Sequence, residues 1–513
     1  MTGFEFRPLY SPMLLHSDDF LFPRTLDSLA TGCVMGICAQ WPLLWKNGNQ
    51  NMLARAIARR LAPVLNMALA VEMAEARENG LLKADTPEGR YHEFDEMLAS
   101  RRLQDVLLDK YKGLSSLPWS VVSDWSFEFD AMLRRLRNDA TDIGDCLGIP
   151  CGLGGLAGME ADCADLHEGG AGVCMLHFHD GKRLVYKPRP MAADVLFARL
   201  APQLNAELGW QAYQGPATLD MGPYGWQQFI ERTPCENMED VRLFFQRQGA
   251  NLALVYLLGG VDFHAENMVP SESFPVPVDL ETAMQPLRTG VHTLRRSGMV
   301  PVPGRDYDYS ALGCAPAPDG SFKGFVWRDR GRDSLHMELA ELPCTGPYCL
   351  PFLDGEHVPV CGFEMTVAAS FARTLKTLAQ AFETNRDLMD TVAEMPIRFI
   401  HRPTLVYQEI LTASLHPENL RSMEGRREFI ETQLGLLGPE TPAQLFGHEA
   451  DTLEEGYIPT CHTRADSRDL WFGAAIEDDF FPATTLDQIR VRVREAPVSC
   501  GRLRQSLLAS LGS

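Results

Sequence analysis

The residues with the clearest chemical potential lie between Asp262 and Asp279. Asn267 follows Asp262 by five positions, and Asp279 follows Asn267 by twelve. Carboxylate and amide oxygens are hard ligands, and metal-bound nucleotide chemistry needs several of them to converge on one point. The alternative for the Asp-Phe-His264-Ala-Glu-Asn stretch is a polar turn with an Asx cap. The spacing therefore indicates a metal–nucleotide site that other parts of the chain must support.

Two apolar segments must position these residues. Residues 241–258 are typical of a long apolar helix that ends just before Asp262. The short run Pro-Val-Pro-Val leads directly to Asp279. In protein kinases, a catalytic-loop Asp positions the hydroxyl, an Asn five residues later binds Mg²⁺, and an Asp after the next strand binds the metal again. The layout favours phosphoryl transfer.

A second constellation precedes the first and ends at Lys187. Gly169 and Gly170 lie in a glycine-rich loop, which is followed by a predicted strand at 173–178, an Asp-Gly turn and a predicted strand at 183–187. Kinases place a phosphate-cradling loop and a phosphate-contacting Lys in this same order. A glycine-rich turn before a hairpin is common by itself, so the combination with Lys187 carries the prediction.

A helix is predicted at 191–208, where kinases place an acidic partner for the strand Lys. Asp194 and Glu207 are both candidates for that partner. Trp226 lies in a predicted strand, where it suits either a core aromatic or the wall of a nucleotide pocket.

Two arginines four positions apart form a third constellation in the segment 397–407, which is predicted to be a strand. Arg398, Arg402 and the nearby Thr404 can grip a phosphate dianion. A solvated strand with ordinary surface arginines explains the same pattern equally well.

The first 145 residues are predicted to be mainly helical, with a further helix at 93–111. An apolar stripe marks one helical face, at Leu53, Ile57, Leu61 and Leu65. This region suits a packing extension, with peptide recognition as the alternative. A Pro- and Gly-rich stretch near 149–158 marks a boundary. The predicted parts are therefore a helical extension at 1–148, a small lobe at 149–231 and a large lobe at 232–513.

Composition narrows the class of protein. The chain has 513 residues, 45% of them hydrophobic and 22% charged, and a formal net charge of −21, which argues against a general nucleic-acid binder. No secretory signal and no apolar stretch long enough to cross a membrane is visible. The 13 cysteines form no Cys-x-x-Cys pair, which indicates reduced thiols and a cytoplasmic protein without membrane partners.

Taken together, the motifs resemble the dehydratase domain of class II lanthipeptide synthetases, the LanM type. The resemblance extends from about Gly158 to about Pro459. Its motifs are Asp165-x-His167, Leu-Val-Tyr-Lys187-Pro-Arg, Asp262-x-His264-x-x-Asn267, Val-Asp279-Leu-Glu281-Thr and Arg398-(x)3-Arg402-x-Thr404-x-x-Tyr407.

The resemblance implies an α+β fold with a bilobal, lipid-kinase-like core, an N-terminal helical extension and additional helices. It also implies that ATP and Mg²⁺ serve to phosphorylate Ser or Thr in a precursor peptide that carries a leader sequence. Phosphate elimination then leaves dehydroalanine or dehydrobutyrine. A single polypeptide would perform both stages.

The same resemblance assigns roles to residues. Residues of the phosphorylation step would be Asp262, His264, Asn267 and Asp279, of which Asn267 and Asp279 bind Mg²⁺. Residues near the nucleotide would be Gly169, Gly170, Lys187, Asn267, Asp279 and Glu281. Residues of elimination would be Asp165, His167, Lys187, Arg398 and Thr404. The resemblance leaves the base that removes the Cα proton open. His167 is one candidate, since a histidine changes charge near neutral pH, and an orienting role is the alternative to catalysis for its partner Asp165.

The sequence departs from the family pattern in three places. Leu166 replaces the usual Pro, and Glu455-Gly-Tyr-Ile-Pro459 replaces a more usual Gly-Asp-Ile-Pro. The zinc-binding cyclase residues that the family carries after the dehydratase are missing, so we expect either a stand-alone dehydratase or one half of a split system with a separate cyclase. Two alternatives remain: a kinase that stops at the phosphorylated product, and a non-catalytic kinase-like scaffold.

Overall fold

The computed structural model of this chain describes residues 20–512, except 43–49, 100–106, 151, 162–165, 167, 303–307, 314–320, 344–348, 394 and 439–440. The described residues form two compact units. The first unit comprises those within Met1–Pro188, Phe325–Ala340 and Arg402–Pro459. The second comprises those within Arg189–Gly324, Glu341–His401 and Thr460–Ser513.

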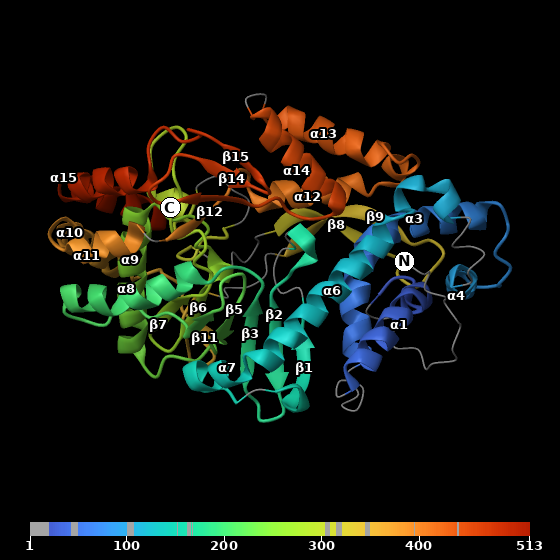
Figure 1. Ribbon diagram of the computed structural model, residues 1–513, viewed down its shortest axis with the longest axis horizontal. Coiled ribbons are helices and arrows are strands. Elements are labelled where there is room, and N and C mark those ends of the chain that lie inside the picture. Colours follow the sequence, from blue (N-terminus) through green and yellow to red (C-terminus); the bar gives the residue numbers. More distant parts are fainter. Residues whose placement is uncertain are drawn as a thin grey trace. The chain divides into compact units, whose positions relative to one another are not determined.

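Helices dominate the N-terminal part of the first unit. They are α1 (Pro23–Gln40), α3 (Gln50–Glu78), α4 (Pro87–Leu98), η1 (Lys112–Leu114), α6 (Leu117–Asn138) and α7 (Ala140–Leu147). The predicted stripe from Leu53 to Leu65 is buried on α3, which packs against α1 and α6 (Figure 1). The helix expected at 93–111 instead begins at Pro87, because Thr86 accepts a hydrogen bond from the Gly89 amide and caps that end.

An antiparallel three-stranded arrangement follows the helices. It comprises η2 (Leu153–Gly155), β1 (Leu156–Glu160), η3 (Glu168–Gly170), β2 (Cys174–Phe178) and β3 (Arg183–Lys187). The β2–β3 hairpin pairs Cys174 with Tyr186 and His177 with Arg183. Its turn contains Gly181 at φ 83°, a conformation that glycine adopts readily. Both strands were predicted from the sequence, and the structure confirms them.

Three helices later in the chain complete the first unit around a small core of their own. They are α12 (Thr404–Ser414), α13 (Gly425–Leu437) and α14 (Ala443–Glu455), with η6 (Pro417–Leu420) between the first two. The prediction of a continuous strand over 397–407 is therefore wrong. The strand ends at Phe399, and Thr404 begins a helix directly after Pro403, a residue that suits a helix start.

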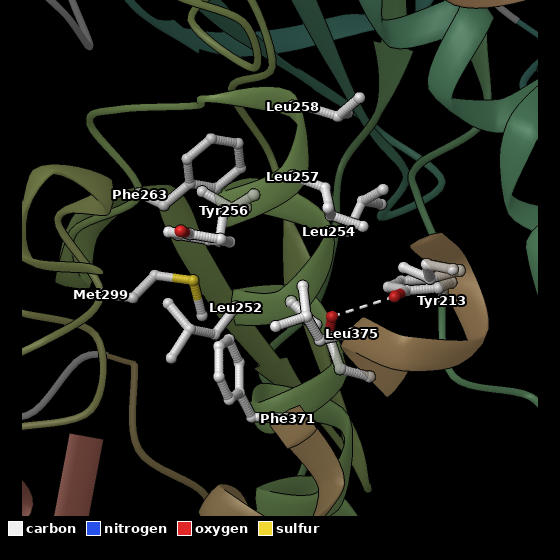
Figure 2. Packing of buried hydrophobic residues seen from close by; sticks show 14 of the residues in the cluster. Tyr213, Leu252, Leu254, Tyr256, Leu257, Leu258, Phe263, Met299, Phe371 and Leu375 are labelled. Atoms are coloured by element: carbon white, nitrogen blue, oxygen red, sulfur yellow. Dashed lines mark hydrogen bonds between the residues drawn. The ribbon is translucent and has the colours of Figure 1, made fainter. Parts of the chain in front are cut away.

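Five helices form the framework of the second unit: α8 (Ala192–Leu208), α9 (Met238–Leu258), α10 (Glu364–Thr384), α11 (Arg386–Ala393) and α15 (Thr485–Leu511). α10 packs along both α9 and α15 (Figure 1). The close α9–α10 contact requires Gly249, because a Cβ there would lie 2.4 Å from the Val367 carbonyl oxygen. Figure 2 shows the core around α9, where the Tyr213 hydroxyl donates a 2.9 Å hydrogen bond to the Ala250 carbonyl.

Short strands and turns surround these helices. The antiparallel pairs of the second unit are β4 (Thr218–Asp220) with β5 (Gly225–Gln228), β6 (Met268–Ser271) with β7 (Phe274–Pro277), and β10 (Phe352–Leu353) with β11 (Glu356–His357). A four-stranded sheet runs in the order β12 (Pro396–Phe399), β13 (Cys461–Arg464), β14 (Leu470–Phe472) and β15 (Ala475–Glu477). The remaining elements are η4 (Ala265–Asn267), η5 (Leu294–Ser297), β8 (Ser321–Arg328) and β9 (His336–Pro343).

The fold thus combines many helices with small antiparallel sheets, as an α+β class predicts. None of the helices in the described part of the chain is both long enough and apolar enough to cross a membrane. The bilobal kinase-like core and the three-part division at 148/149 and 231/232 remain predictions.

Candidate active site

The candidate active site begins where α9 ends. Asn237 caps the first turn of α9 by accepting hydrogen bonds from the Glu239 and Asp240 amides. At the other end, the Arg492 guanidinium of α15 donates to the carbonyls of Leu257 (2.8 Å) and Leu258 (3.0 Å). Carbonyls at a helix C-terminus lack partners within the helix. The buried Arg492 therefore anchors the point from which the next loop starts.

The backbone of Asp262 is held in an unusual conformation. Its φ is 68°, in the left-handed region that Asp and Asn tolerate better than other side chains. On one side, Val261 exchanges hydrogen bonds with Thr282 through its amide and its carbonyl. On the other side, the Phe263 amide donates to the Ser297 carbonyl at 2.8 Å. These contacts fix the loop on both sides of Asp262.

The carboxyl group of Asp262 has a pKa above its ordinary value. Burial is the main cause, and the nearby carboxylates Asp279 and Glu281 add to it, whereas His264 and Arg398 oppose it. His264 accepts a hydrogen bond from the Glu266 amide at Nδ1, and its Nε2 lies 3.5 Å from Asp262 Oδ1. A carboxylate with a raised pKa that stays 41% exposed suits a proton acceptor.

Asn267 and Asp279 flank the two ends of one β-hairpin. β6 and β7 pair Met268 with Pro277, and the Val278 amide donates to the Asn267 carbonyl at 3.1 Å. The twelve-residue separation therefore brings Asn267 and Asp279 to the same open end of this hairpin. The Asn267 side-chain nitrogen donates to the Asp262 carbonyl at 2.8 Å, which directs the amide and links it to the loop.

Arg189 is the centre of the charged groups beside this hairpin. Its guanidinium contacts Asp279 Oδ1 at 2.6 Å, Glu281 Oε2 at 3.2 Å and Asp194 Oδ2 at 3.2 Å. Burial disfavours the charge of Arg189, but the three carboxylates hold its pKa above the ordinary arginine value. Asp194 is fixed in turn by Gln227, whose side-chain amide donates to Asp194 Oδ1 at 2.9 Å.

Arg398 approaches the same cluster from β12. Its guanidinium donates to Glu281 Oε1, so Glu281 bridges Arg189 and Arg398. Burial opposes the charge of Arg398, while Glu281 and Asp279 raise its pKa. Gln285 fixes this end of β12, because its side chain donates to the Arg398 carbonyl and accepts from the Ile400 amide.

We call Asp194, Asp262, Asp279, Glu281, Arg189 and Arg398 the acidic cluster. Four carboxylates and two guanidinium groups lie together in this cluster, and bound cations are often the largest local charges at such sites. No group of three His, Cys, Asp or Glu residues positioned to hold a metal occurs in the described chain. Mg²⁺ commonly uses one or two carboxylates and completes its shell with phosphates and water. Asn267 and Asp279 are the two residues of this region that could hold such a nucleotide-bound Mg²⁺.

The other predicted site residues belong to the first unit. Gly170 and Lys187 are buried, Gly169 is exposed, and Thr404 is half-buried at the start of α12. Asp165 and His167 lie outside the described residues. Of the predicted set, the second unit brings together Asp262, His264, Asn267, Asp279, Glu281 and Arg398.

Arg402 is buried and is not a surface arginine. In the first unit its Nε donates to Glu449 Oε1 at 2.7 Å, and its Nη2 donates to Thr441 Oγ1 at 2.9 Å. Glu449 is fully buried and also accepts a 2.6 Å hydrogen bond from the Tyr407 hydroxyl. These contacts favour a structural role for Arg402, and the joint grip of Arg398 and Arg402 on a phosphate stays a prediction.

Sequence reasoning missed Arg189 as a site residue. Its position two residues after Lys187, in the run Lys-Pro-Arg-Pro, was the available signal. Trp226 is fully buried, which supports the core-aromatic interpretation. Of the two acidic candidates on α8, Asp194 pairs with Arg189, while Glu207 accepts a hydrogen bond from Asn385.

Comparison with known proteins adds two findings. A relative from Lactococcus lactis subsp. lactis, the lacticin 481/lactococcin biosynthesis protein LcnDR2, is 24% identical over 243 residues. That similarity covers 43% of this chain and 24% of the relative, so the chain matches about a quarter of the relative's length. The sequence profile of a protein family described as a domain of unknown function (DUF4135) matches residues 111–464. Because this match covers more than half of the chain, the protein belongs to the DUF4135 family.

Proposed function

We propose that this protein dehydrates Ser and Thr residues of a ribosomally made precursor peptide, in two stages that use ATP and Mg²⁺. The observation that carries the proposal is the convergence of Asp262, Asn267 and Asp279 in one unit, next to the cation Arg398. The printed name of the relative, a lacticin 481/lactococcin biosynthesis protein, supports peptide modification as the context. The kinase-like bilobal core belongs to the same proposal.

In the first stage, the peptide hydroxyl is phosphorylated. Asp262 orients the hydroxyl and accepts its proton, a role that its raised pKa suits. His264 stays beside Asp262 and helps to fix the carboxylate. Mg²⁺ would be held by Asn267 and Asp279 and would neutralise the phosphate oxygens of ATP. Arg189, which contacts Asp279 at 2.6 Å, orients that carboxylate toward the metal position.

In the second stage, phosphate leaves and a double bond forms. A base removes the Cα proton, its electron pair forms the Cα=Cβ bond, and the Cβ–O bond breaks to release phosphate. We assign the base to the Asp165-x-His167 motif. Cations stabilise the enolate and the departing phosphate. Lys187 and Arg398 supply the positive charge, and Thr404 supplies a hydrogen-bond donor at the start of α12.

The remaining parts of the proposal concern nucleotide and partners. Gly169, Gly170 and Lys187 contact the phosphates of ATP, with Glu281 holding the surrounding cations in place. The precursor peptide binds through its leader sequence, and a separate cyclase closes the rings.

Mass spectrometry tests the proposal. The protein is incubated with ATP, Mg²⁺ and a Ser- and Thr-containing precursor peptide encoded beside its gene. We expect a loss of about 18 Da per modified residue, the mass of one water. A gain of about 80 Da, the mass of a phosphoryl group, would instead identify a kinase that stops at the phosphorylated product. An unchanged peptide that nevertheless binds the protein would identify a non-catalytic scaffold.

The Arg398→Ala variant separates the two stages. We expect phosphopeptide to accumulate, with elimination slowed about 100-fold, because a preorganised cation is lost from the leaving phosphate. Arg490→Ala on the exposed face of α15 is the matched control and should dehydrate like the parent. Full dehydration by Arg398→Ala would contradict the role of Arg398.

A further inference from the structure

Tyr309 is joined through its backbone to the loop that carries Asp262 and His264. The Tyr309 carbonyl accepts a 3.0 Å hydrogen bond from the Ala265 amide. The next residue, Ser310, forms an antiparallel bridge with His264. All of these residues belong to the second unit. The backbone of Tyr309 is therefore fixed beside the Asp262 loop.

A hydrogen-bonded turn holds Tyr309 from its other side. The Asp308 carboxylate accepts a 2.9 Å hydrogen bond from the Ser310 amide, and the Ser310 hydroxyl accepts one of 3.0 Å from the Gly313 amide. Short polar side chains that bond to backbone amides nearby stabilise turns of this kind. With its backbone fixed on both sides, Tyr309 presents its side chain in a direction set by its own contacts.

The Tyr309 side chain contacts His264 with its ring and Glu266 with its hydroxyl. The rings of Tyr309 and His264 lie edge to face, with centroids 5.7 Å apart and an interplanar angle of 68°, a geometry that aromatic pairs favour. The Tyr309 hydroxyl donates a 2.9 Å hydrogen bond to Glu266 Oε1. The Glu266 amide in turn donates to His264 Nδ1 at 3.2 Å. The three residues therefore form a closed ring of contacts around the imidazole.

These contacts determine which nitrogen of His264 faces Asp262. A backbone amide can donate to Nδ1 only when that nitrogen carries no proton. The proton of the neutral imidazole is then on Nε2, which lies 3.5 Å from Asp262 Oδ1. A hydrogen, and not a lone pair, consequently faces the carboxylate that is proposed to accept the hydroxyl proton.

Fold stability gives little reason for an aromatic ring at position 309. Tyr309 is 41% exposed, so its burial stabilises the fold less than that of Tyr213, which is 2% exposed. The hydrogen bond from Tyr309 to Glu266 is also exposed, where water competes for both partners. The position of the ring against His264 favours a role in orienting the imidazole.

We propose that Tyr309 is a positioning residue for peptide phosphorylation, because it holds the His264 imidazole with the Nε2 proton toward Asp262. This inference rests on the proposed function, which makes Asp262 the proton acceptor of the first stage. Tyr309 acts through His264 and does not touch the peptide. Its effect falls on phosphoryl transfer, the step that Asp262 serves.

Nitrogen NMR tests the hold on His264 without a substrate. The chain has 13 histidines, so the His264 signals of the ¹⁵N-labelled protein are identified by their loss in His264→Asn. At about pH 8, where an ordinary imidazole is neutral, we expect one protonated and one unprotonated ring nitrogen in the parent. In Tyr309→Leu the two shifts should move toward each other, because a freed ring exchanges between tautomers. Unchanged His264 shifts in Tyr309→Leu would overturn the hold.

Phe352→Leu is the matched control. The rings of Phe352 and His357 lie 5.8 Å apart elsewhere in the second unit, so this variant also removes a contact between an aromatic ring and a histidine. It should alter the signals of His357, leave those of His264 unchanged and phosphorylate peptide at the parental rate. A loss of rate as large as that of Tyr309→Leu would show that general destabilisation lowers the rate, and would overturn the positioning role.

Single-turnover phosphorylation of the precursor peptide tests the purpose of the contact. Phosphopeptide and dehydrated peptide are counted together, so the rate of elimination does not affect the result. In Tyr309→Leu we expect the maximal rate to fall about tenfold, part of the roughly 10²–10⁴-fold that a proton-transferring group contributes, while the peptide concentration at half-maximal rate stays within about twofold. Tyr309→Phe keeps the ring and should stay within about threefold of the parental rate, since an exposed hydrogen bond contributes little.

Two outcomes of the kinetic test would overturn the positioning role. One is a parental maximal rate in Tyr309→Leu. The other is a change confined to the half-maximal peptide concentration, which would mean that Tyr309 contacts the peptide itself. If the parent protein transfers no phosphoryl group to the peptide, the proposed function fails and the positioning role fails with it, while the NMR shifts still decide whether Tyr309 holds His264.

Discussion

Two groups of arginine and carboxylate side chains in this molecule differ in their exposure to solvent. In the second unit, Arg189 and Arg398 lie among several carboxylates, and Asp279 keeps 35% of its side chain exposed. In the first unit, Arg402 pairs with Glu449, which has no exposed surface. The first arrangement keeps part of a carboxylate at the surface, whereas the carboxylate of the second is closed to solvent.

The comparison explains why two arginines four residues apart have different roles. Arg398 lies within β12 beside Glu281. Arg402 lies beyond the strand, in a hydrogen-bond network with Thr441, Tyr407 and Glu449. Excess charge with exposure is typical of a functional site. Balanced charge with complete hydrogen bonding is typical of a structural ion pair.

The strongest test neutralises a carboxylate in the acidic cluster. Asp262→Asn should lower the rate of peptide phosphorylation about 10³-fold, because a general base is lost while the left-handed backbone is kept. The measurement is phosphoryl transfer followed by mass spectrometry. Asp451→Asn, which removes an exposed carboxylate paired with Arg427, should have no effect on the rate. Phosphorylation at the parental rate by Asp262→Asn would show that the acidic cluster does not serve phosphoryl transfer through Asp262.

The next test removes one partner of the buried Arg402–Glu449 ion pair. Glu449→Leu should lower the free energy of unfolding by about 3–5 kcal/mol, because it leaves the buried Arg402 charge without its partner. Urea unfolding measures the change. The double variant Arg402→Met/Glu449→Leu should recover most of the loss, since no charge is then buried.

Peptide phosphorylation by the same double variant tests whether Arg402 has a role in the reaction. The double variant should phosphorylate peptide within about twofold of the parent at a temperature where both are folded. A large loss of phosphorylation in the folded double variant would show that Arg402 serves the reaction after all.

The smallest expected effect is a pH-dependent gain in stability. The folded-state pKa of Asp262 lies above the ordinary value of 3.8, so its charged form opposes folding at neutral pH. Asp262→Asn should therefore raise the free energy of unfolding at pH 7, by about 1 kcal/mol at most, since the side chain is 41% exposed and solvent screens the effect.

The pH series supplies the control for this prediction. Well below pH 3.8 the carboxyl is protonated in both the folded and the unfolded chain, so the difference between parent and variant should disappear. Urea midpoints at pH 7 and at about pH 2 measure it. A variant less stable than the parent at pH 7 would mean that its partners stabilise the Asp262 charge more than burial disfavours it.

Local patterns predicted much of this architecture. The apolar stripe on α3, the β2–β3 hairpin and the helix before Asp262 depend on neighbours within a few residues. The Asn267–Asp279 pair could also be predicted, because a short hairpin closes the gap. In each case the information lies inside one element or one turn.

Contacts between residues far apart in the chain could not be predicted from the sequence. Arg189 joins Asp279 across 90 residues, and no periodicity marks such a pairing. The segment after Phe399 has the apolar and aromatic composition of a strand, but its strand pairing ends there and a helix starts after Pro403. Thr404 consequently lies on a helix end, where composition alone predicted a sheet.

The contact of Arg492 with α9 has a consequence for protein synthesis. Arg492 donates to carbonyls that leave the ribosome 235 and 234 residues earlier. At 5–20 residues per second, roughly 12–50 s separate the two during translation. For most of that interval the nascent chain already contains Asp262, Asn267 and Asp279 but lacks the arginine that anchors their loop. The backbone from which the Asp262 loop starts therefore gains its hydrogen bonds from Arg492 only after nearly the whole chain has been translated.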